Sequence, residues 1–359
     1  MTALGYLETK LHPTFVSSQL LSRRRLLSKL DRICMVRLAL VHGAAGSGKS
    51  SLLYDWVRQQ DAKVGWYSLG EEDRDPHLFF PYFVRCLTQS YPGSLTRSAN
   101  LLESDTPLEA LFDELATSFV NELLHFRKRV VIVLDDYHLV GDVSLIHRWI
   151  DFLVKKGPPN LTVVLVTREL PNLPLAFLRA KGMLVEIRQD DLRFDEDEAA
   201  ELFERVWQRS IPAHLLNLLL AKTEGWVTGL QLVSQAIEGK PEAEMKSYLE
   251  SLEGKEQFIY NYLATEVFEL QPERVRNFLK FTSIVDQFCP ELASLLTNEN
   301  AIERIQHLDS SRLFLVHLNG EGEWFRYHHL FRDFLRRRLS IDHDSQELEH
   351  LHLRAAQCF

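Results

Sequence analysis

Cysteine and long apolar runs are scarce in this sequence of 359 residues, and each shortage excludes a class of protein. The four cysteines show no Cys-x-x-Cys spacing; they are Cys34, Cys86, Cys289 and Cys358. Such scattered thiols argue against a disulfide framework and against a zinc site. The longest apolar runs, such as residues 130–134 and 161–166, have the length of a strand, whereas a transmembrane helix needs about 20 apolar residues. We therefore expect no membrane span.

The charge balance and the N-terminus exclude two further classes. A net charge of −9 disfavours non-specific binding of the whole chain to nucleic acid. The first ten residues include Glu8 and no apolar segment, which argues against a secretory signal, so we expect a cytoplasmic protein. The 45% hydrophobic and 25% charged residues are typical of a globular chain, and its length predicts two or three domains.

The most informative segment is an apolar run that turns through glycines into an amphipathic pattern. Residues 43–50 read GAAGSGKS and fit the phosphate-loop pattern G-x-x-x-x-G-K-[ST] at every fixed position. Glycine lets backbone N–H groups converge on phosphate, Lys49 can reach the β- and γ-phosphates, and the Ser50 hydroxyl can bind Mg²⁺. An ordinary glycine-rich turn is the alternative, which the flanking strand and helix patterns disfavour. We expect ATP or ADP to contact Gly43, Ala44, Ala45, Gly46, Ser47, Gly48, Lys49, Ser50 and Ser51.

A second motif ends the apolar run at residues 130–134 with Asp135 and Asp136. A carboxylate at the carboxyl end of such a strand can hold Mg²⁺ beside a phosphate loop. We predict that Asp135, together with Ser50, binds Mg²⁺ and that Asp136 orients or deprotonates an attacking water. The alternative is that both acids merely end a strand at the surface.

An arginine follows the apolar run at residues 161–166. Arg168 leaves the end of this expected core strand, where a guanidinium can reach a γ-phosphate and so distinguish ATP from ADP. The sequence gives equal weight to a surface arginine paired with Glu169.

Strand and helix patterns alternate in the first half of the chain. We expect strands at 36–41, 64–69, 130–134, 161–166 and 184–188, and helices at about 49–60, 77–91, 108–126 and 144–155. This alternation, with near-continuous apolar strands, predicts an α/β fold whose parallel sheet is covered on both faces.

From about residue 193, amphipathic helices follow one another. Four prolines each stand near an expected helix start; they are Pro212, Pro241, Pro272 and Pro290. We expect a short strand pair at 313–318 and 324–327 around a turn at 319–322, and helices at about 328–339 and 345–357. Helices beside a small hairpin suggest a winged-helix unit.

Two arginine clusters give weaker signals. The arginines at 23–25 are interpreted as the solvated face of a short helix. Arg332 and the arginines at 336–338 are interpreted as another solvated face, with contact to the DNA backbone or to another domain as alternatives. The adjacent His328 and His329 lack the spacing of a zinc site.

Together these motifs resemble the N-terminal half of the MalT-type, ATP-dependent transcription activators of the LuxR family, within the STAND class of signalling NTPases. The resemblance runs nearly from end to end. It is carried by Lys10-Leu11, residues 23–27, 65–69, 134–138 and 160–168, Gly225-Trp226 with residues 230–232, and residues 323–331. The DDYH and YHxLF segments are far more specific than a phosphate loop alone.

The resemblance implies three domains that close over a nucleotide. They are a P-loop NTPase domain at 1–192, a helical domain at 193–240 and a winged-helix domain at 241–342, with a further helical region beginning at 343–359. It implies that Lys49 and Ser50 hold phosphate and Mg²⁺. It also implies that Asp135 is the Walker B carboxylate at the end of its strand and that Arg168 senses phosphate. It also implies that His328 touches the β-phosphate of ADP in the closed state and that residues around 15–25 line the adenine pocket.

The resemblance finally implies an ATP/ADP switch in which ADP holds the resting state closed, ATP permits self-association and slow hydrolysis resets the cycle. Inducer and DNA would bind C-terminal domains that this chain lacks, so it is either a piece of a longer protein or a shortened form. Residues 225–229 depart from the class because they contain no proline, which leaves their contact with adenine open. Two rival functions are an ATPase that uses turnover for remodelling or phosphoryl transfer, and direct DNA binding by the winged helix.

Overall fold

The computed structural model describes residues 6–13, 20–60, 63–252, 257–310, 314–318 and 324–356. Contacts divide the chain into two compact units. The first unit contains residues 1–43 and 48–192, and the second contains residues 44–47 and 193–359. Four residues of the expected phosphate loop are therefore grouped with the second unit.

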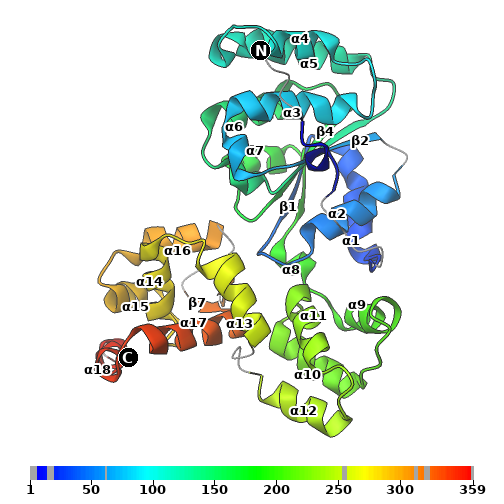
Figure 1. Cartoon of the computed structure of the whole chain (residues 1–359). Helices are drawn as coiled ribbons and strands as arrows, with labels where there is room; N and C mark the ends of the chain where they lie inside the picture. The colour runs from blue at the N-terminus through cyan, green and yellow to red at the C-terminus, as the bar shows by residue number, and fades with distance from the viewer. Residues whose placement is uncertain are drawn as a thin grey trace. The chain divides into compact units, whose positions relative to one another are not determined.

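A parallel five-stranded sheet forms the centre of the first unit (Figure 1). Its strands stand in the order β2 (Lys63–Ser68), β3 (Val130–Asp135), β4 (Leu161–Thr167), β1 (Leu38–His42) and β5 (Leu184–Ile187). Every expected strand is present, with ends that differ by no more than two residues. Because all strands run in the same direction, the carboxyl ends of β1, β3 and β4 meet at one edge of the sheet.

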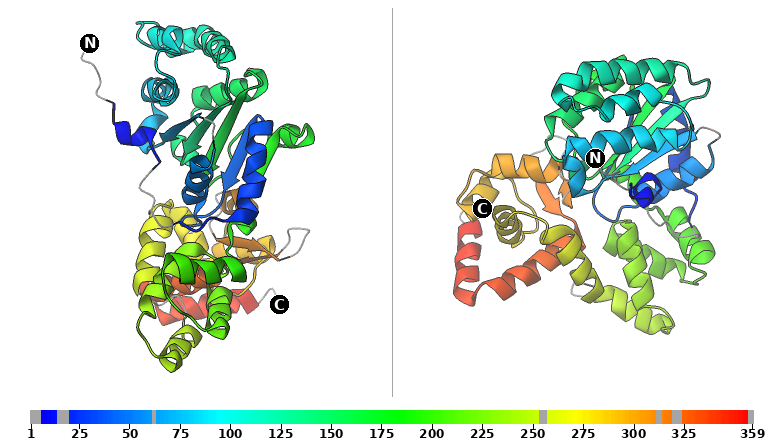
Figure 2. Two further views of the ribbon diagram at one scale, coloured as in Figure 1. Left: turned by 90° about the vertical axis from the view of Figure 1, so that its right-hand side faces the viewer. Right: turned by 45° about the horizontal axis from the view of Figure 1, so that its top comes forward.

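Helices cover both faces of this sheet, as the apolar strands predict (Figure 2). One face packs against α3 (Pro76–Thr88), α5 (Leu108–Leu124) and α6 (Ser144–Lys156), and the other against α1 (Arg24–Leu30) and α2 (Lys49–Arg58). Successive strand residues alternate between the two cores, so that Ile132 faces the first core and Val133 the second. The unit is completed by η1 (Glu8–Leu11), η2 (Asp31–Met35), η3 (Glu71–Arg74), α4 (Thr96–Leu102), η4 (Tyr137–Val140), α7 (Leu175–Ala180) and α8 (Gln189–Leu192).

The described residues of the second unit are mostly helical and include a small hairpin. Its elements are α9 (Glu196–Glu201), the π-helix η5 (Leu202–Val206), α10 (Ala213–Thr223), α11 (Val227–Ala236), α12 (Glu242–Glu250), α13 (Gln257–Leu263), the π-helix η6 (Ala264–Phe268), α14 (Glu273–Thr282), α15 (Pro290–Thr297), α16 (Ala301–Ser310), β6 (Leu315–His317), β7 (Phe325–Tyr327), α17 (His329–Asp342) and α18 (Ser345–Ala356). The four singled-out prolines each cap or open a helix, because the fixed φ of proline suits that position and its missing N–H costs nothing there.

The antiparallel pair β6–β7 confirms the expected hairpin. Leu313, the turn at 319–322 and Cys358 lie outside the described residues. The fold class is thus confirmed: an α/β P-loop unit is followed by helices and a winged-helix element. Among the helices that the structure describes, none is long and apolar enough to cross a membrane.

Candidate nucleotide-binding site

The phosphate-loop sequence connects the end of β1 to the start of α2. Gly46 and Gly48 adopt positive φ angles of 65° and 82°, which a residue with a Cβ rarely adopts. Lys49 begins α2, is only 7% exposed, and donates from Nζ to the Gly43 carbonyl at 2.9 Å. Burial, together with the positive charge of Arg168, lowers the pKa of Lys49 to about 8, although Asp136 and Asp135 act in the opposite direction. An anion placed beside this ammonium would offset the cost of burying its charge.

Asp135 ends β3 next to the loop. It is 1% exposed, and its Oδ1 accepts from the Ser50 hydroxyl at 2.9 Å and from the Asp136 N–H at 3.1 Å. Burial, together with the charge of Asp136, raises the pKa of Asp135 to about 7. Its Oδ2 has no hydrogen-bond partner among the residues described. A buried carboxylate oxygen beside a serine hydroxyl is the hard donor set that Mg²⁺ prefers, so these residues fit the ion.

The turn after β3 holds Asp136 in place through hydrogen bonds that the sequence alone did not predict. Asp136 has φ 57°, a strained angle for a residue with a side chain. Tyr137, 1% exposed, donates its hydroxyl to His147 Nδ1 at 2.8 Å, and His147 Nε2 donates to the Gly141 carbonyl at 2.8 Å. Arg74 Nε adds a bond to the Leu139 carbonyl at 2.9 Å. The turn that carries Asp136 is therefore held at three points.

Arg168 follows β4, which lies between β3 and β1 in the sheet. Its charge lowers the pKa of Lys49 and, after burial, that of His138, which falls to about 3. Because β4 lies between β3 and β1, Arg168 leaves the sheet at the same carboxyl edge as Asp135 and the phosphate loop. The first unit thus brings together Lys49, Ser50, Asp135, Asp136 and Arg168, all of them expected from the sequence.

His328 lies in the second unit at the start of α17. It is 5% exposed, and its Nε2 lies 2.8 Å from the Thr223 carbonyl, so Nε2 carries the hydrogen. Its Nδ1 is buried and finds no hydrogen-bond partner in the described part of the chain. Burial lowers the pKa of His328 to about 4, although the charge of Glu224 opposes the shift. The neutral ring therefore presents a buried acceptor.

Glu224, which ends α10 with φ 49°, forms a buried ion pair beside His328. Its oxygens accept from the two terminal nitrogens of Arg326 at 2.8 and 3.0 Å, and Arg193 lies 3.6 Å away. Burial alone would raise the pKa of Glu224, but the Arg326 hydrogen bonds and the nearby cations lower it to about 2. Glu224 is therefore ionised at neutral pH.

The proline-free segment 225–229 contacts two of the four loop residues that belong to the second unit. Trp226 Nε1 donates to the Ala45 carbonyl at 3.1 Å, and Thr228 Oγ1 donates to the Gly46 carbonyl at 2.9 Å. The resemblance singled out this segment without assigning it a partner in the loop, because nothing in the sequence pairs residues that far apart.

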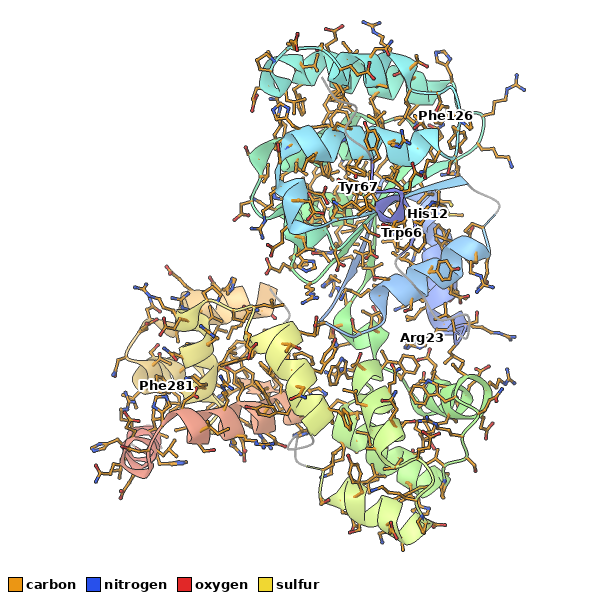
Figure 3. The ribbon with its side chains drawn as sticks, viewed as in Figure 1. His12, Arg23, Trp66, Tyr67, Phe126 and Phe281 are labelled. Carbon is orange, nitrogen blue, oxygen red and sulfur yellow. The ribbon has the colours of Figure 1, made fainter. Side chains whose placement is uncertain are left out.

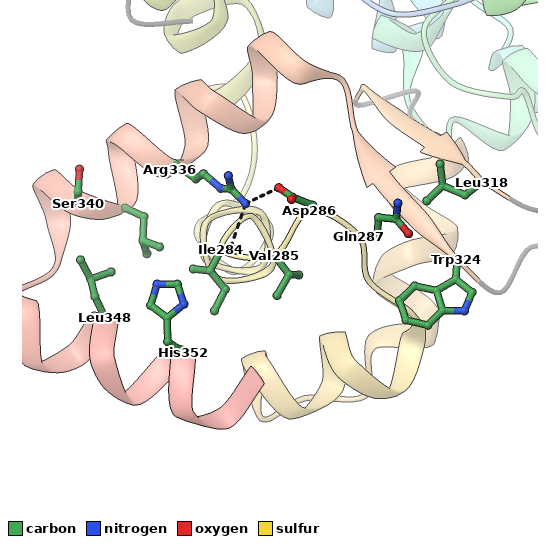
Figure 4. A pocket seen from close by; sticks show the side chains of 11 residues that line it. Ile284, Val285, Asp286, Gln287, Leu318, Trp324, Arg336, Ser340, Leu348 and His352 are labelled. Carbon is green, nitrogen blue, oxygen red and sulfur yellow. Dashed lines mark hydrogen bonds and ion pairs between the residues drawn. The ribbon is translucent and has the colours of Figure 1, made fainter. Parts of the chain in front are cut away.

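In each arginine cluster one guanidinium corrects the solvated-face interpretation, whereas Arg24 and Arg25 are exposed as that interpretation predicts. Arg23 is 5% exposed and donates to the Leu192 carbonyl at 2.9 Å (Figure 3). Arg336 lies at a pocket of about 920 Å³ and donates to the Ser283 and Ile284 carbonyls and to Asp286 (Figure 4). Both guanidiniums bind their own unit, because main-chain carbonyls that end helices nearby accept their hydrogens.

Of the expected adenine-lining segment, residues 15–19 lie outside the described residues.

Comparisons with known proteins agree with these two units. Residues 20–166 match the model of an AAA ATPase domain, and residues 264–348 match the MalT winged helix domain. The chain is 32% identical over 341 residues to the HTH-type transcriptional regulator MalT of Vibrio parahaemolyticus and 33% identical over 341 residues to that of Yersinia enterocolitica. Each alignment covers 93% of this chain and 37% of the relative, so the chain spans little more than a third of their length.

The fold has a solved counterpart in a Walker-type ATPase of Pyrococcus abyssi. Its TM-score is 0.56 at 13% identity, with 91% of this chain and 97% of that chain covered. The resemblance to MalT-type regulators is thus confirmed: the chain carries an AAA ATPase domain and a MalT winged-helix domain.

Proposed function

We propose that this chain, a relative of the MalT regulators, is the nucleotide-controlled switch of a transcription activator. One observation carries the proposal. The carboxyl edge of a single sheet gathers a buried lysine, a serine–aspartate pair and an arginine, which are the groups that a nucleoside di- or triphosphate with Mg²⁺ requires.

In the loaded site, Lys49 exchanges its bond to the Gly43 carbonyl for phosphate oxygens, with the N–H groups of residues 43–51 around them. Ser50 and Asp135 would hold Mg²⁺, which would supply positive charge to neutralise the phosphates. Asp136, more exposed than Asp135, positions the attacking water, and Arg168 senses the γ-phosphate. Hydrolysis is slow and serves to reset the switch.

His328 reports the diphosphate state. Its buried Nδ1 has no partner among the described residues, and we assign this atom, in the protonated ring, to the β-phosphate of ADP. ADP then favours a closed resting state, and ATP favours an open, self-associating state. A difference of a few kcal/mol between the two states is enough for the nucleotides to shift the balance.

The relatives are HTH-type transcriptional regulators, which supports a role of this chain in transcription. We propose that inducer and DNA are bound by parts of the longer protein beyond the aligned third, and that the protein works in the cytoplasm. Arg332 and Arg336 of α17 bond to groups of their own unit, which favours a role in packing over contact with DNA.

The test is to purify the chain without added nucleotide, denature it and identify what is released by chromatography. ADP close to one molecule per chain supports the resting switch. A chain that comes empty and neither binds ADP nor hydrolyses ATP refutes it. Rapid turnover of ATP indicates a working ATPase, and a steep salt-dependent affinity for duplex DNA indicates direct DNA binding.

A further inference from the structure

We propose that Trp226 and Thr228 are positioning residues of the phosphate loop. Their hydrogen bonds to two consecutive loop carbonyls orient the N–H groups that receive phosphate. The inference rests on the proposed nucleotide binding and assigns a role to the segment whose missing proline left its function open.

Peptide geometry connects these bonds to phosphate binding. A trans peptide is planar, and its C=O and N–H point in opposite directions. The bond from Trp226 Nε1 fixes the Ala45 carbonyl and thereby directs the Gly46 N–H to the opposite side. The bond from Thr228 Oγ1 fixes the Gly46 carbonyl and directs the Ser47 N–H in the same way. Two consecutive donors of the loop are thus oriented before a ligand arrives.

The close approach of Thr228 requires glycine at position 46. A Cβ added to Gly46 would lie 2.3 Å from Thr228 Oγ1 and 2.6 Å from the Tyr262 hydroxyl, shorter than any real contact of that kind. The φ of 65° adds backbone strain for any other residue. Gly46, which stands at a variable position of the motif, therefore serves both the turn and the approach of α11.

The two donors are themselves rigid. Trp226 is the N-cap residue of α11 and is 3% exposed. Its ring packs edge-on against Phe314 at 5.3 Å and lies 6.1 Å from the ring of His328. Thr228 lies in the first turn of the same helix. Because an indole has a single donor and no acceptor, the loop uses the whole hydrogen-bonding capacity of Trp226.

The experiment compares ADP affinity, measured by titration calorimetry, across paired variants. Trp226→Phe keeps a ring and removes the donor, and Thr228→Val keeps the shape and removes the hydroxyl. Each should weaken ADP binding about 3- to 10-fold, the range expected for one neutral hydrogen bond. Thr228→Ser restores the hydroxyl and should restore the affinity, which a purely structural role for Thr228 would not require.

Matched controls come from the same unit. Trp207→Phe alters a tryptophan that packs on Phe203, and Thr265→Val removes a hydroxyl bonded within its own helix at the Asn261 carbonyl. Both controls should bind ADP as the original chain does, and circular dichroism checks that every variant is folded.

The outcomes separate the two ideas. If the original chain binds ADP and the Trp226 and Thr228 variants bind it equally well, the positioning role is overturned and the nucleotide switch stands. If Thr228→Ser fails to restore an affinity lost in Thr228→Val, the positioning role is also overturned. If the original chain binds no nucleotide at all, both proposals fail.

Discussion

His328 should take up a proton when the chain binds ADP. In the present structure Nε2 carries the ring hydrogen and donates it to the Thr223 carbonyl. The neutral Nδ1 is then an acceptor, and it cannot bond a phosphate oxygen, which is also an acceptor. A contact between Nδ1 and phosphate therefore requires the imidazolium form.

The pKa of His328 sets the size of the effect. Because burial lowers this pKa to about 4, protonating the ring at pH 7 costs about 4 kcal/mol before any contact with ADP is made. The cost falls by about 1.4 kcal/mol for each pH unit toward acid. The contribution of His328 to ADP affinity should thus grow by up to about tenfold per pH unit as the pH falls from 8 to 6.

The assay is titration calorimetry of ADP at several pH values, with His328→Gln as the reference. The ratio of the two affinities removes the titration of ADP itself, since both proteins bind the same ligand. In buffers of different ionisation enthalpy, the original chain should take up close to one proton more than the variant. A ratio that stays constant with pH, without extra proton uptake, would refute the phosphate contact of His328.

Three further outcomes test other parts of the account. Lys49→Ala should abolish ADP binding, because it removes the buried ammonium, whereas Lys155→Ala, which removes an exposed partner of Asp151, should leave affinity unchanged in the same titration. Arg168→Ala should slow ATP hydrolysis in a phosphate-release assay yet keep ADP affinity, since ADP has no γ-phosphate. Glu224→Gln should lower the urea-unfolding free energy at pH 7 by about 3 kcal/mol, from a pKa of about 2 against 4.5 in the unfolded chain. Because the pKa of Glu224 is depressed in the folded chain, the original chain keeps this stabilisation above about pH 4.5 and loses it as the pH falls toward 2. Equal unfolding free energies of the two proteins at pH 7 would contradict the stabilising ion pair of Glu224.

Local patterns in the sequence were sufficient to predict the strands of the parallel sheet and the aspartates at the carboxyl end of β3. The apolar strands ending in His42, Asp135 and Thr167 are continuous, and each is flanked by helix or turn signals, so strand type and direction could be read directly. The short helices α4 and α7 were missed because one or two turns give too few apolar positions to show a helical period.

Long-range hydrogen bonds escaped prediction for a different reason. Arg23 and Leu192 are 169 residues apart, and Trp226 and Ala45 are 181 apart, so no window of sequence contains both partners. An arginine cluster looks the same in sequence whether it faces water or binds helix-end carbonyls. The buried state of Arg23 and the inward bonds of Arg336 could be learned only from the packed chain.

The grouping of residues 44–47 with the second unit has a consequence for how the chain can be cut. A fragment ending at Leu192 retains every strand of the large sheet, together with Lys49 and Asp135. It loses Trp226 and Thr228, so the carbonyls of Ala45 and Gly46 would bond to water and the loop would sample orientations that the intact chain excludes. Such a fragment would keep the sheet but bind nucleotide more weakly, and a gene fusion at this boundary would transfer the sheet without the two bonds that orient the loop.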